Sequence, residues 1–475
     1  MSKVNLVYGV KDKPGFWKTI VLALQQVLAI LAATIVVPVI VGNGMSQSAA
    51  LFGAGVGTLV YLAFTKFKSP VFLGSSFAFI GSMSAAFSGA MSASVGYLGI
   101  IIGAIMAGLV YVVIALIVKA VGTKWISKIM PASVIGPTVS VIGLSLAGNA
   151  VGDLTKGSYN VSQMVEVIKD HQVVLEETFV PTASPFIALL CGLVTLAVVI
   201  ICSAYGKKML KIIPFIMGIL AGYALAAIFT VIGILADVPK LIVINFGLFK
   251  DMQWLPSFTF IEAFKGFDDL SGFGAYLGTI AVAYIPVAFV VFAEHLADHK
   301  NISSIIGDDL LENPGLHRTL LGDGVGSMVG AFFGGCPNTT YGESVGCVAI
   351  SGNASVVTIL TAAIICVISA FFAPFVTLLA TIPACVMGGV CFALYGFIAV
   401  SGLKMIQGVD LSDNKNLFTV STVLIAGVGG LVLNIGKVTL TAVACALILG
   451  ILVNLLCSIK GKKAEKAQET EEKAC

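Results

Sequence analysis

The sequence contains little charge. Asp, Glu, Lys and Arg make up 11% of its 475 residues, against about 25% in an ordinary soluble protein. A soluble chain of this length needs a polar exterior, so these few charges exclude a water-soluble enzyme. Hydrophobic residues make up 58%, and uncharged stretches recur that are about 20 residues long, enough to cross a bilayer. The sequence therefore predicts a polytopic helical membrane protein.

Several chemical motifs are also missing. The ten cysteines form no CxxC pair and no ligand-spaced cluster, which argues against a zinc site or a disulfide framework. The chain has no phosphate-binding loop, dinucleotide fingerprint or nucleophile elbow, so ATP-driven transport and membrane-embedded hydrolysis lack support. Residues 1–18 lack the apolar core and cleavage site of a signal peptide. We expect a membrane protein that is not an enzyme and that has no cofactor and no metal.

Apolar runs predict fourteen membrane spans. They lie at 19–42, 48–65, 71–89, 95–118, 130–148, 182–204, 212–236, 273–297, 319–335, 337–351, 355–379, 382–402, 416–434 and 438–458. The third and tenth are short and rich in Gly, Ser and Thr, and each is the third span of a seven-span half. The predicted parts are an N-terminal segment 1–18, a first repeat 19–236, an outer connecting segment 237–272, a second repeat 273–458 and a polar tail 459–475, which we expect to be unstructured.

The basic residues set the orientation. Of the 27 Lys and Arg residues, all but six fall on one side of this fourteen-span arrangement, the six being Lys156, Lys169, Lys240, Lys250, Lys265 and Lys437. The richer side is expected to be cytoplasmic and carries both termini. Because seven is odd, the second half is inverted relative to the first. No ring of charges follows a pore, so a passive channel is disfavoured.

The two atypical spans contain matching stretches. Residues 73–79 read Leu-Gly-Ser-Ser-Phe-Ala-Phe and residues 337–343 read Pro-Asn-Thr-Thr-Tyr-Gly-Glu. Inverted repeats interrupted at matching positions are typical of secondary transporters, whose substrate site lies where the broken segments meet. An extended stretch at membrane depth must pair its backbone, and two such stretches could pair with each other. The alternative is a pair of tightly packed small-residue helices.

Two acidic residues stand out in this apolar context. Glu343 is the only Asp, Glu, Lys, Arg or His between Gly324 and Leu403, which makes it a functional-site candidate. Glu294 follows an uncharged run and shares a helix face with Asp298, four residues later. Each could instead lie at a span end, and hydropathy alone places Glu294 at the cytoplasmic margin.

The remaining polar residues of the spans have structural explanations. His295 and His299 lie on the neighbouring helix face, but the HExxH order of a metallopeptidase is absent. Gln25 and Gln26 are expected to hydrogen-bond another helix. Asp323 is expected to cap a helix or to partner a polar group across the bundle, and Arg318 to anchor the inner interface.

With these residues in place, the chain resembles the uracil permeases of the nucleobase-ascorbate transporter (nucleobase:cation symporter-2) family. The resemblance covers all fourteen spans. Four islands carry it: residues 74–79 (Gly-Ser-Ser-Phe-Ala-Phe), 293–295 (Ala-Glu-His), 313–318 (Asn-Pro-Gly-Leu-His-Arg) and 338–343 (Asn-Thr-Thr-Tyr-Gly-Glu), the last followed by Gly346. It implies an α-helical fold of seven plus seven inverted spans with short strands in segments 3 and 10, core and gate domains, and a homodimer.

The resemblance also implies the site. Glu294 and Glu343 would grip the nucleobase, Phe77 and Gly342 would line the site and offer backbone contacts, and Tyr341 would pack nearby. It places Glu294 deeper than hydropathy does. Uracil offers two ring N–H donors that two carboxylates can accept, and two carbonyls that backbone N–H groups can serve. Relatives selective for xanthine or urate tend to carry Gln at the position of Glu343.

The coupling ion implied by the family is H⁺, with Na⁺ as an open alternative. The family's uracil permeases often have His at the positions of Gln26 and Asp298, and close relatives have an Arg where residues 351–353 read Ser-Gly-Asn. Of these replacements Asp298 can titrate and Gln26 cannot. The expected function is therefore proton-coupled import of uracil, carried by Glu294 and Asp298, by an elevator-like movement. The alternative is a xanthine, urate or other purine permease of the same fold.

Overall fold

The computed structural model describes residues 6–123, 125–157, 160–169, 172–181, 183–207, 210, 213–252, 254–268, 273–435, 438–440 and 442–472. The chain divides into two compact units. Unit 1 consists of Met1–Ser145, Ser257–Ile368 and Tyr395–Cys475, and unit 2 of Leu146–Pro256 and Ser369–Leu394.

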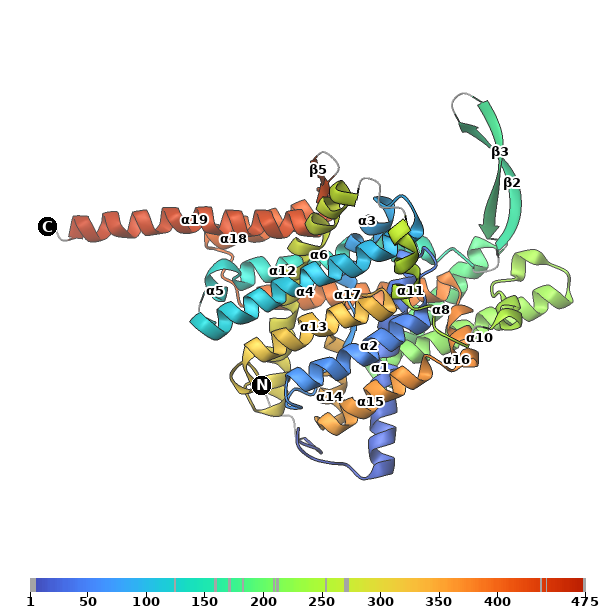
Figure 1. The fold of residues 1–475 in the computed structure, drawn as a ribbon, viewed down its shortest axis with the longest axis horizontal. Helices are drawn as coiled ribbons and strands as arrows, with labels where there is room; N and C mark the ends of the chain where they lie inside the picture. The colour runs from blue at the N-terminus through green and yellow to red at the C-terminus, as the bar shows by residue number, and fades with distance from the viewer. Residues whose placement is uncertain are drawn as a thin grey trace. The chain divides into compact units, whose positions relative to one another are not determined.

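Unit 1 consists of long helices with two short strand-to-helix breaks (Figure 1). Its first stretch contains α1 (Phe16–Val41), α2 (Gln47–Phe64), β1 (Leu73–Ser75), the 3-10 turn η1 (Phe77–Phe79), α3 (Ile80–Ser88), α4 (Ala93–Val121), α5 (Ile126–Ile129) and α6 (Ala132–Ser145). Its second stretch contains α11 (Thr259–Phe264), η4 (Lys265–Asp268), α12 (Phe273–Ile306), the π-turn η5 (Leu311–Gly315), α13 (Leu316–Gly334), β4 (Asn338–Thr340), α14 (Gly342–Ser351) and α15 (Val356–Ser369). Its third stretch contains most of α17 (Ala384–Ile406), then α18 (Asn414–Val428), β5 (Leu433–Ile435), β6 (Val438–Leu440) and α19 (Ala442–Glu472).

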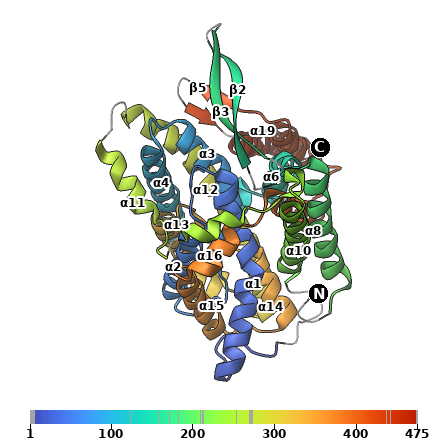
Figure 2. The same ribbon diagram turned by 90° about the vertical axis from the view of Figure 1, so that its right-hand side faces the viewer.

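Unit 2 is smaller. It contains α7 (Ala147–Asp153), the hairpin strands β2 (Asn160–Lys169) and β3 (Gln172–Pro181), α8 (Pro185–Tyr205), α10 (Pro214–Leu235), the 3-10 turns η2 (Pro239–Leu241) and η3 (Phe246–Asp251), α16 (Ala373–Ala380) and the first residues of α17. Proline occupies the first position of α8 and of α10, where its missing N–H costs nothing. The two helices lie side by side (Figure 2).

The helices fit a membrane protein. Within the described residues, eight helices are long and apolar enough to cross a bilayer, or nine if one bent pair counts as a single span. Many large apolar side chains on these helices are exposed, as lipid-facing surfaces require, among them Leu109, Val113 and Leu116 on α4. A multi-pass membrane protein is thus supported, while fourteen spans and the inverted repeat stay predictions.

Glycines allow α2 and α13 to pack closely. A Cβ atom on Gly53 would lie 2.5 Å from the carbonyl oxygen of Gly330, and one on Gly57 would lie 2.8 Å from that of Gly326. Only glycine leaves room for backbones this close, and membrane helices without a hydrophobic driving force gain packing energy from such contacts. The two helices lie beside each other in unit 1 (Figure 1) and lead into β1 and β4 respectively.

The two atypical spans pair as expected. Strands β1 and β4 are antiparallel, with Leu73 opposite Thr340, Gly74 opposite Thr339 and Ser75 opposite Asn338. All six strand residues are buried. The pairing satisfies backbone groups that neither strand could satisfy alone inside a membrane. The prediction of two paired strands is confirmed, and the alternative of two uninterrupted helices is wrong.

Other expectations need correction. The strands of segments 3 and 10 are not the only ones, because the described residues also contain the hairpins β2–β3 and β5–β6. The helix that contains the predicted span 273–297 is longer than the span, since α12 continues to Ile306. The tail was expected to be unstructured, yet α19 extends through Glu472, while residues 473–475 lie outside the described part.

Candidate functional site

The crossing of β1 and β4 brings two helix starts into one region of unit 1. Helical structure begins at Phe77 after β1 and at Gly342 after β4. The first N–H groups of a helix have no partner within the helix, and its N-terminus carries partial positive charge. We call β1 with η1 and α3 the first arm, and β4 with α14 the second arm. Together they present backbone donors suited to carbonyl or anionic groups.

Hydrogen bonds hold the second arm against the first. The Tyr341 hydroxyl donates to the Ser75 carbonyl over 2.6 Å, and the Phe72 N–H donates to the Ser344 hydroxyl oxygen over 3.0 Å. The Gln26 amide also donates to the Ser344 hydroxyl, so Gln26 bonds another segment as predicted. A Cβ atom on Gly74 would lie 2.3 Å from the Tyr341 ring. Gly74 therefore permits the crossing.

The second arm supplies a carboxylate at its helix start. Glu343 is the second residue of α14, and its side chain is partly exposed although it lies deep in a largely uncharged stretch. Gly342, the first residue, is exposed. The position of Glu343 next to orphan N–H groups lets one ligand meet a carboxylate and backbone donors together.

Helix α12 brings the other acidic residues. Glu294 is partly exposed and interacts electrostatically with Asp298, Glu343 and Asp323. Within the described residues, its carboxylate makes no hydrogen bond and no ion pair. Twelve residues of α12 follow Glu294, so it lies inside the helix and not at its end. The deeper placement in the membrane that the resemblance implies stays a prediction.

Asp298 is a partnered carboxylate. The Thr340 hydroxyl donates to its Oδ2 over 2.9 Å, which ties α12 to the last residue of β4. Its Oδ1 lies 3.7 Å from the position that a Cβ atom on Gly342 would take. Asp298 is 9% exposed. It therefore contacts the second arm on the same side as the helix start.

The two histidines of α12 are fully buried and their nitrogens are in use. His295 Nδ1 lies 2.7 Å from Asp323 Oδ2, and His295 Nε2 lies 3.0 Å from the Thr319 hydroxyl. His299 Nδ1 donates to the His295 carbonyl over 2.9 Å, and its Nε2 lies 2.7 Å from the Tyr61 hydroxyl. The predicted polar partner of Asp323 is thus His295, and these nitrogens brace α12.

Packing fixes the aromatic residues of the first arm. Phe77 is 8% exposed, and its ring meets that of Tyr395 edge-on with centroids 5.8 Å apart. Phe79 stacks on Tyr284, with centroids 5.6 Å apart and planes 26° apart. Phe77 lies at the helix start, so one residue offers both an apolar ring and a backbone donor.

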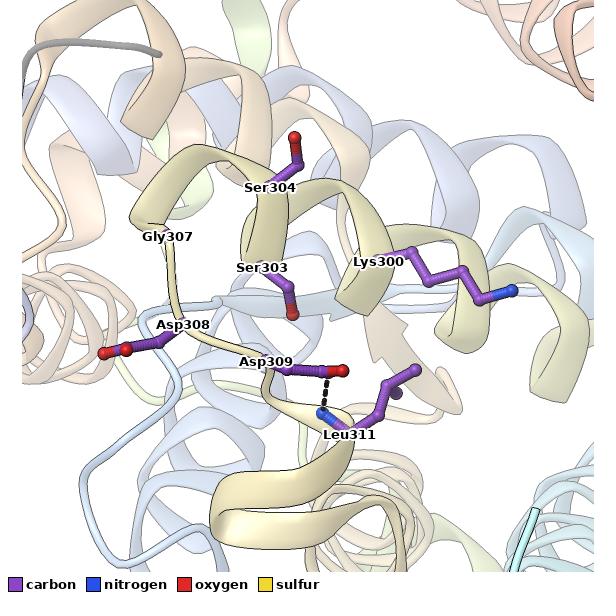
Figure 3. A pocket seen from close by; sticks show the side chains of 7 residues that line it. All are labelled: Lys300, Ser303, Ser304, Gly307, Asp308, Asp309 and Leu311. Carbon is purple, nitrogen blue, oxygen red and sulfur yellow. Dashed lines mark hydrogen bonds between the residues drawn. The ribbon is translucent and has the colours of Figure 1, made fainter. Parts of the chain in front are cut away.

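An open hollow of about 380 Å³ lies elsewhere in unit 1. Figure 3 shows it at the end of α12 and in the following loop, lined by residues between Lys300 and Leu311. The Lys300 amine points away from the Asp308 carboxylate, and Asp309 Oδ1 accepts from the Leu311 N–H over 2.8 Å. This hollow contains none of the predicted site residues.

Sequence reasoning missed three residues that position the site. Thr340 and Ser344 lie in the motif beside Glu343, but nothing in the sequence distinguishes a hydroxyl that bonds a distant helix. Tyr61 contacts His299 across 238 positions and also lies 2.6 Å from the Ser69 hydroxyl. The sequence feature that could have identified these three residues is that each is polar and lies within or beside an apolar span.

Comparison with known proteins supports a transporter. Residues 17–436 match a family described as the permease family. A protein of Bacillus subtilis (strain 168) named uracil permease is 36% identical over 476 residues, covering 99% of each chain. A protein of Escherichia coli (strain K12) with the same name is 34% identical over 450 residues, covering 94% of this chain and 93% of the relative.

Solved structures show a shared fold at low identity. The transmembrane domain of a cyanobacterial bicarbonate transporter, BicA, is 16% identical with a TM-score of 0.59, covering 95% of this chain and 100% of that one. The murine anion transporter Solute Carrier 26 family member A9 is 13% identical with a TM-score of 0.62, covering 95% of this chain and 69% of that one.

Proposed function

Because the chain belongs to this permease family of transporters, we propose that it imports uracil by proton symport. The convergence of Glu294 and Glu343 beside two helix starts carries the proposal. Relatives that cover almost the whole chain and are named uracil permease support the substrate. The proposed location is the cell membrane, with both termini in the cytoplasm and two chains forming a homodimer.

The proposed site fits the hydrogen-bonding pattern of uracil. The ring carries two N–H donors, which Glu294 and Glu343 accept, and two carbonyl oxygens, which accept from N–H groups at Phe77 and Gly342. Bonds to ionised acceptors are roughly twice as strong as neutral ones, so the carboxylates supply most of the discrimination. The Phe77 ring covers one part of the planar base, and Tyr341 keeps the second arm in place.

The proposed coupling uses Glu294 and Asp298 as proton carriers. Both lie on one face of α12, and Asp298 contacts Thr340 of the second arm. With substrate bound, the proton would reside on Asp298, which leaves Glu294 ionised to accept from the ring and offsets the repulsion among the neighbouring carboxylates. Substrate and proton would then cross together by an elevator-type alternation of access.

Uptake into proteoliposomes tests the function. Purified protein should accumulate labelled uracil when an inward proton gradient is imposed, and excess xanthine should leave this accumulation unchanged. Accumulation abolished by xanthine would support a purine permease instead. Accumulation driven by a Na⁺ gradient without a proton gradient would show that the coupling ion is Na⁺ and not H⁺.

The variant Asp298→Asn tests whether proton coupling can be lost while uracil binding is kept. The variant keeps an oxygen that can accept from Thr340 but cannot exchange a proton, so uracil exchange between preloaded vesicles and the medium should persist while gradient-driven accumulation fails. Asp309→Asn, which changes the same functional group outside the site, is the matched control. Normal accumulation by Asp298→Asn would remove Asp298 from the proton path.

A further inference from the structure

A small cavity in unit 1 is lined by Asp323 and shares no lining residue with the hollow of Figure 3. The centre of a water molecule can occupy a volume of about 10 Å³ inside it. This volume is close to the minimum that a cavity needs to hold one water. Its polar lining includes Tyr111 of α4, Asp323 of α13 and Asn338 of β4. These side chains are respectively 4%, 1% and 2% exposed.

Each of these three side chains has an unused polar atom. In the described part of the chain, Tyr111 Oη, Asp323 Oδ1 and Asn338 Oδ1 are buried without a hydrogen-bond partner. An unpaired buried polar atom is destabilising, so native proteins seldom leave three around one void. The other polar atoms of two of them are occupied: Asp323 Oδ2 lies against His295 Nδ1, and Asn338 Nδ2 donates to the Gly53 carbonyl over 3.0 Å.

We propose that this cavity binds one water molecule as a fixed part of the protein. A water can donate to Asp323 Oδ1 and Asn338 Oδ1 and accept from the Tyr111 hydroxyl. Those three bonds satisfy all three unpaired atoms and equal the usual number made by a buried water. The water links α4, α13 and β4, of which β4 is the strand of the second arm.

The hydrogen-bond directions around His295 show what this water holds in place. The single Thr319 hydroxyl proton goes to the Leu316 carbonyl, so the Thr319 oxygen accepts from His295 Nε2–H. One further proton then lies between His295 Nδ1 and Asp323 Oδ2, on either atom. The water is the hydrogen-bond donor to the remaining oxygen of Asp323, Oδ1. It thereby fixes the orientation of the carboxyl group that braces α12 beside Glu294.

Thr339 offers the competing explanation. Its hydroxyl is buried, has no hydrogen-bond partner in the described residues, and lies close enough to interact with Tyr111 and Asp323. A small rotation of Thr339 could satisfy these two residues and leave the cavity dry. A Na⁺ ion is the other occupant to test, because the lining oxygens are ligands that hard cations prefer.

Tyr111→Phe and Thr339→Val distinguish these occupants by thermal unfolding of the purified transporter. If water is bound, Tyr111→Phe removes one of its partners and lowers the apparent melting temperature by about 2 °C. The same drop should occur in the Thr339→Val background. In a dry cavity, Tyr111→Phe removes an unpaired hydroxyl and should leave the melting temperature unchanged or raise it. A drop that vanishes in the Thr339→Val background assigns the contact to Thr339 and overturns the proposal.

A cryo-electron microscopy map at a resolution that shows ordered waters identifies the occupant directly. The proposal expects one density within hydrogen-bonding distance of Tyr111, Asp323 and Asn338, in NaCl and in choline chloride alike, and weaker density in Tyr111→Phe. An empty cavity overturns it. Density present only in NaCl overturns it in favour of a cation.

Discussion

The two arms share one backbone plan but differ in chemistry. Each has a strand of three residues, one connecting residue and then a helical start, so Ala78 and Glu343 occupy the same second helical position. The first arm is packed by aromatic rings at Phe77 and Phe79, in addition to hydrogen bonds such as the one from the Ser82 hydroxyl to the Ala283 carbonyl. The second is held by hydrogen bonds, and it alone carries a carboxylate. In the proposed site, the first arm therefore supplies shape and the second supplies selectivity.

Removing the carboxylate of the second arm should have the largest effect. Glu343→Gln replaces an ionised acceptor by an amide, at a cost of about 1.5–3 kcal/mol per lost bond, and should weaken uracil uptake about 10- to 100-fold. The variant should still fold, because within the described residues this carboxylate makes no side-chain hydrogen bond. Glu312→Gln, on the exposed turn before α13, is the matched control and should transport normally. Normal uptake by Glu343→Gln would remove the distinction between the arms.

Disturbing the crossing of β1 and β4 should have the second largest effect. Gly74→Ala places a methyl group 2.3 Å from the Tyr341 ring, and overpacking of this kind costs up to about 3 kcal/mol. We expect a lower melting temperature and reduced uptake. Ser75→Ala is the neighbouring control, because Tyr341 bonds the Ser75 carbonyl and not its side chain. Equal behaviour of the two variants would mean that the close approach at Gly74 is unimportant.

Loss of the hydrogen bond between α12 and the second arm should destabilise the protein somewhat less than Gly74→Ala does. Thr340→Val removes the donor to Asp298 Oδ2 and leaves that buried oxygen unpaired, which costs about 2 kcal/mol. Thermal unfolding should show the loss. Thr361→Val, which removes a hydroxyl bonded to the backbone of its own helix α15, provides the comparison and should cost less. A smaller loss for Thr340→Val than for the control would contradict a role in joining the segments.

The smallest effect is expected at the link between the arms. Tyr341→Phe keeps the ring but loses one neutral hydrogen bond to Ser75, worth about 1 kcal/mol. The melting temperature should fall slightly while uracil still binds. Loss of binding as large as that of Glu343→Gln would mean that Tyr341 contacts the substrate directly.

The sequence predicted the paired strands because small, β-capable residues interrupt two apolar runs at matching positions. It also singled out Glu343 and Glu294, since a carboxylate in an apolar run is costly and therefore noticeable. It did not predict that α12 continues to Ile306, because hydropathy scores His295, Asp298 and His299 as solvated. In the folded chain each is buried with a partner on another segment, and hydropathy carries no information about such partners.

The hairpin β2–β3 was missed for a different reason. Both strands are rich in β-branched residues, and Val165, Glu166 and Val167 of β2 alternate apolar and polar, which are strand signals. The count of apolar runs leaves this segment between the spans 130–148 and 182–204 and assigns no strand to it. The sequence predicts that Gln26 bonds another helix, but it does not identify the partner, Ser344, which is 318 positions away.

Equilibrium binding of labelled uracil to the purified protein tests the two-carboxylate site most directly. Wild type, Glu294→Gln, Glu343→Gln and the control Glu312→Gln should be compared at one pH. We predict at least about a tenfold loss of affinity for each of the two site variants, as expected for a lost charge-assisted bond, and none for the control. Wild-type affinity in both site variants would contradict the account.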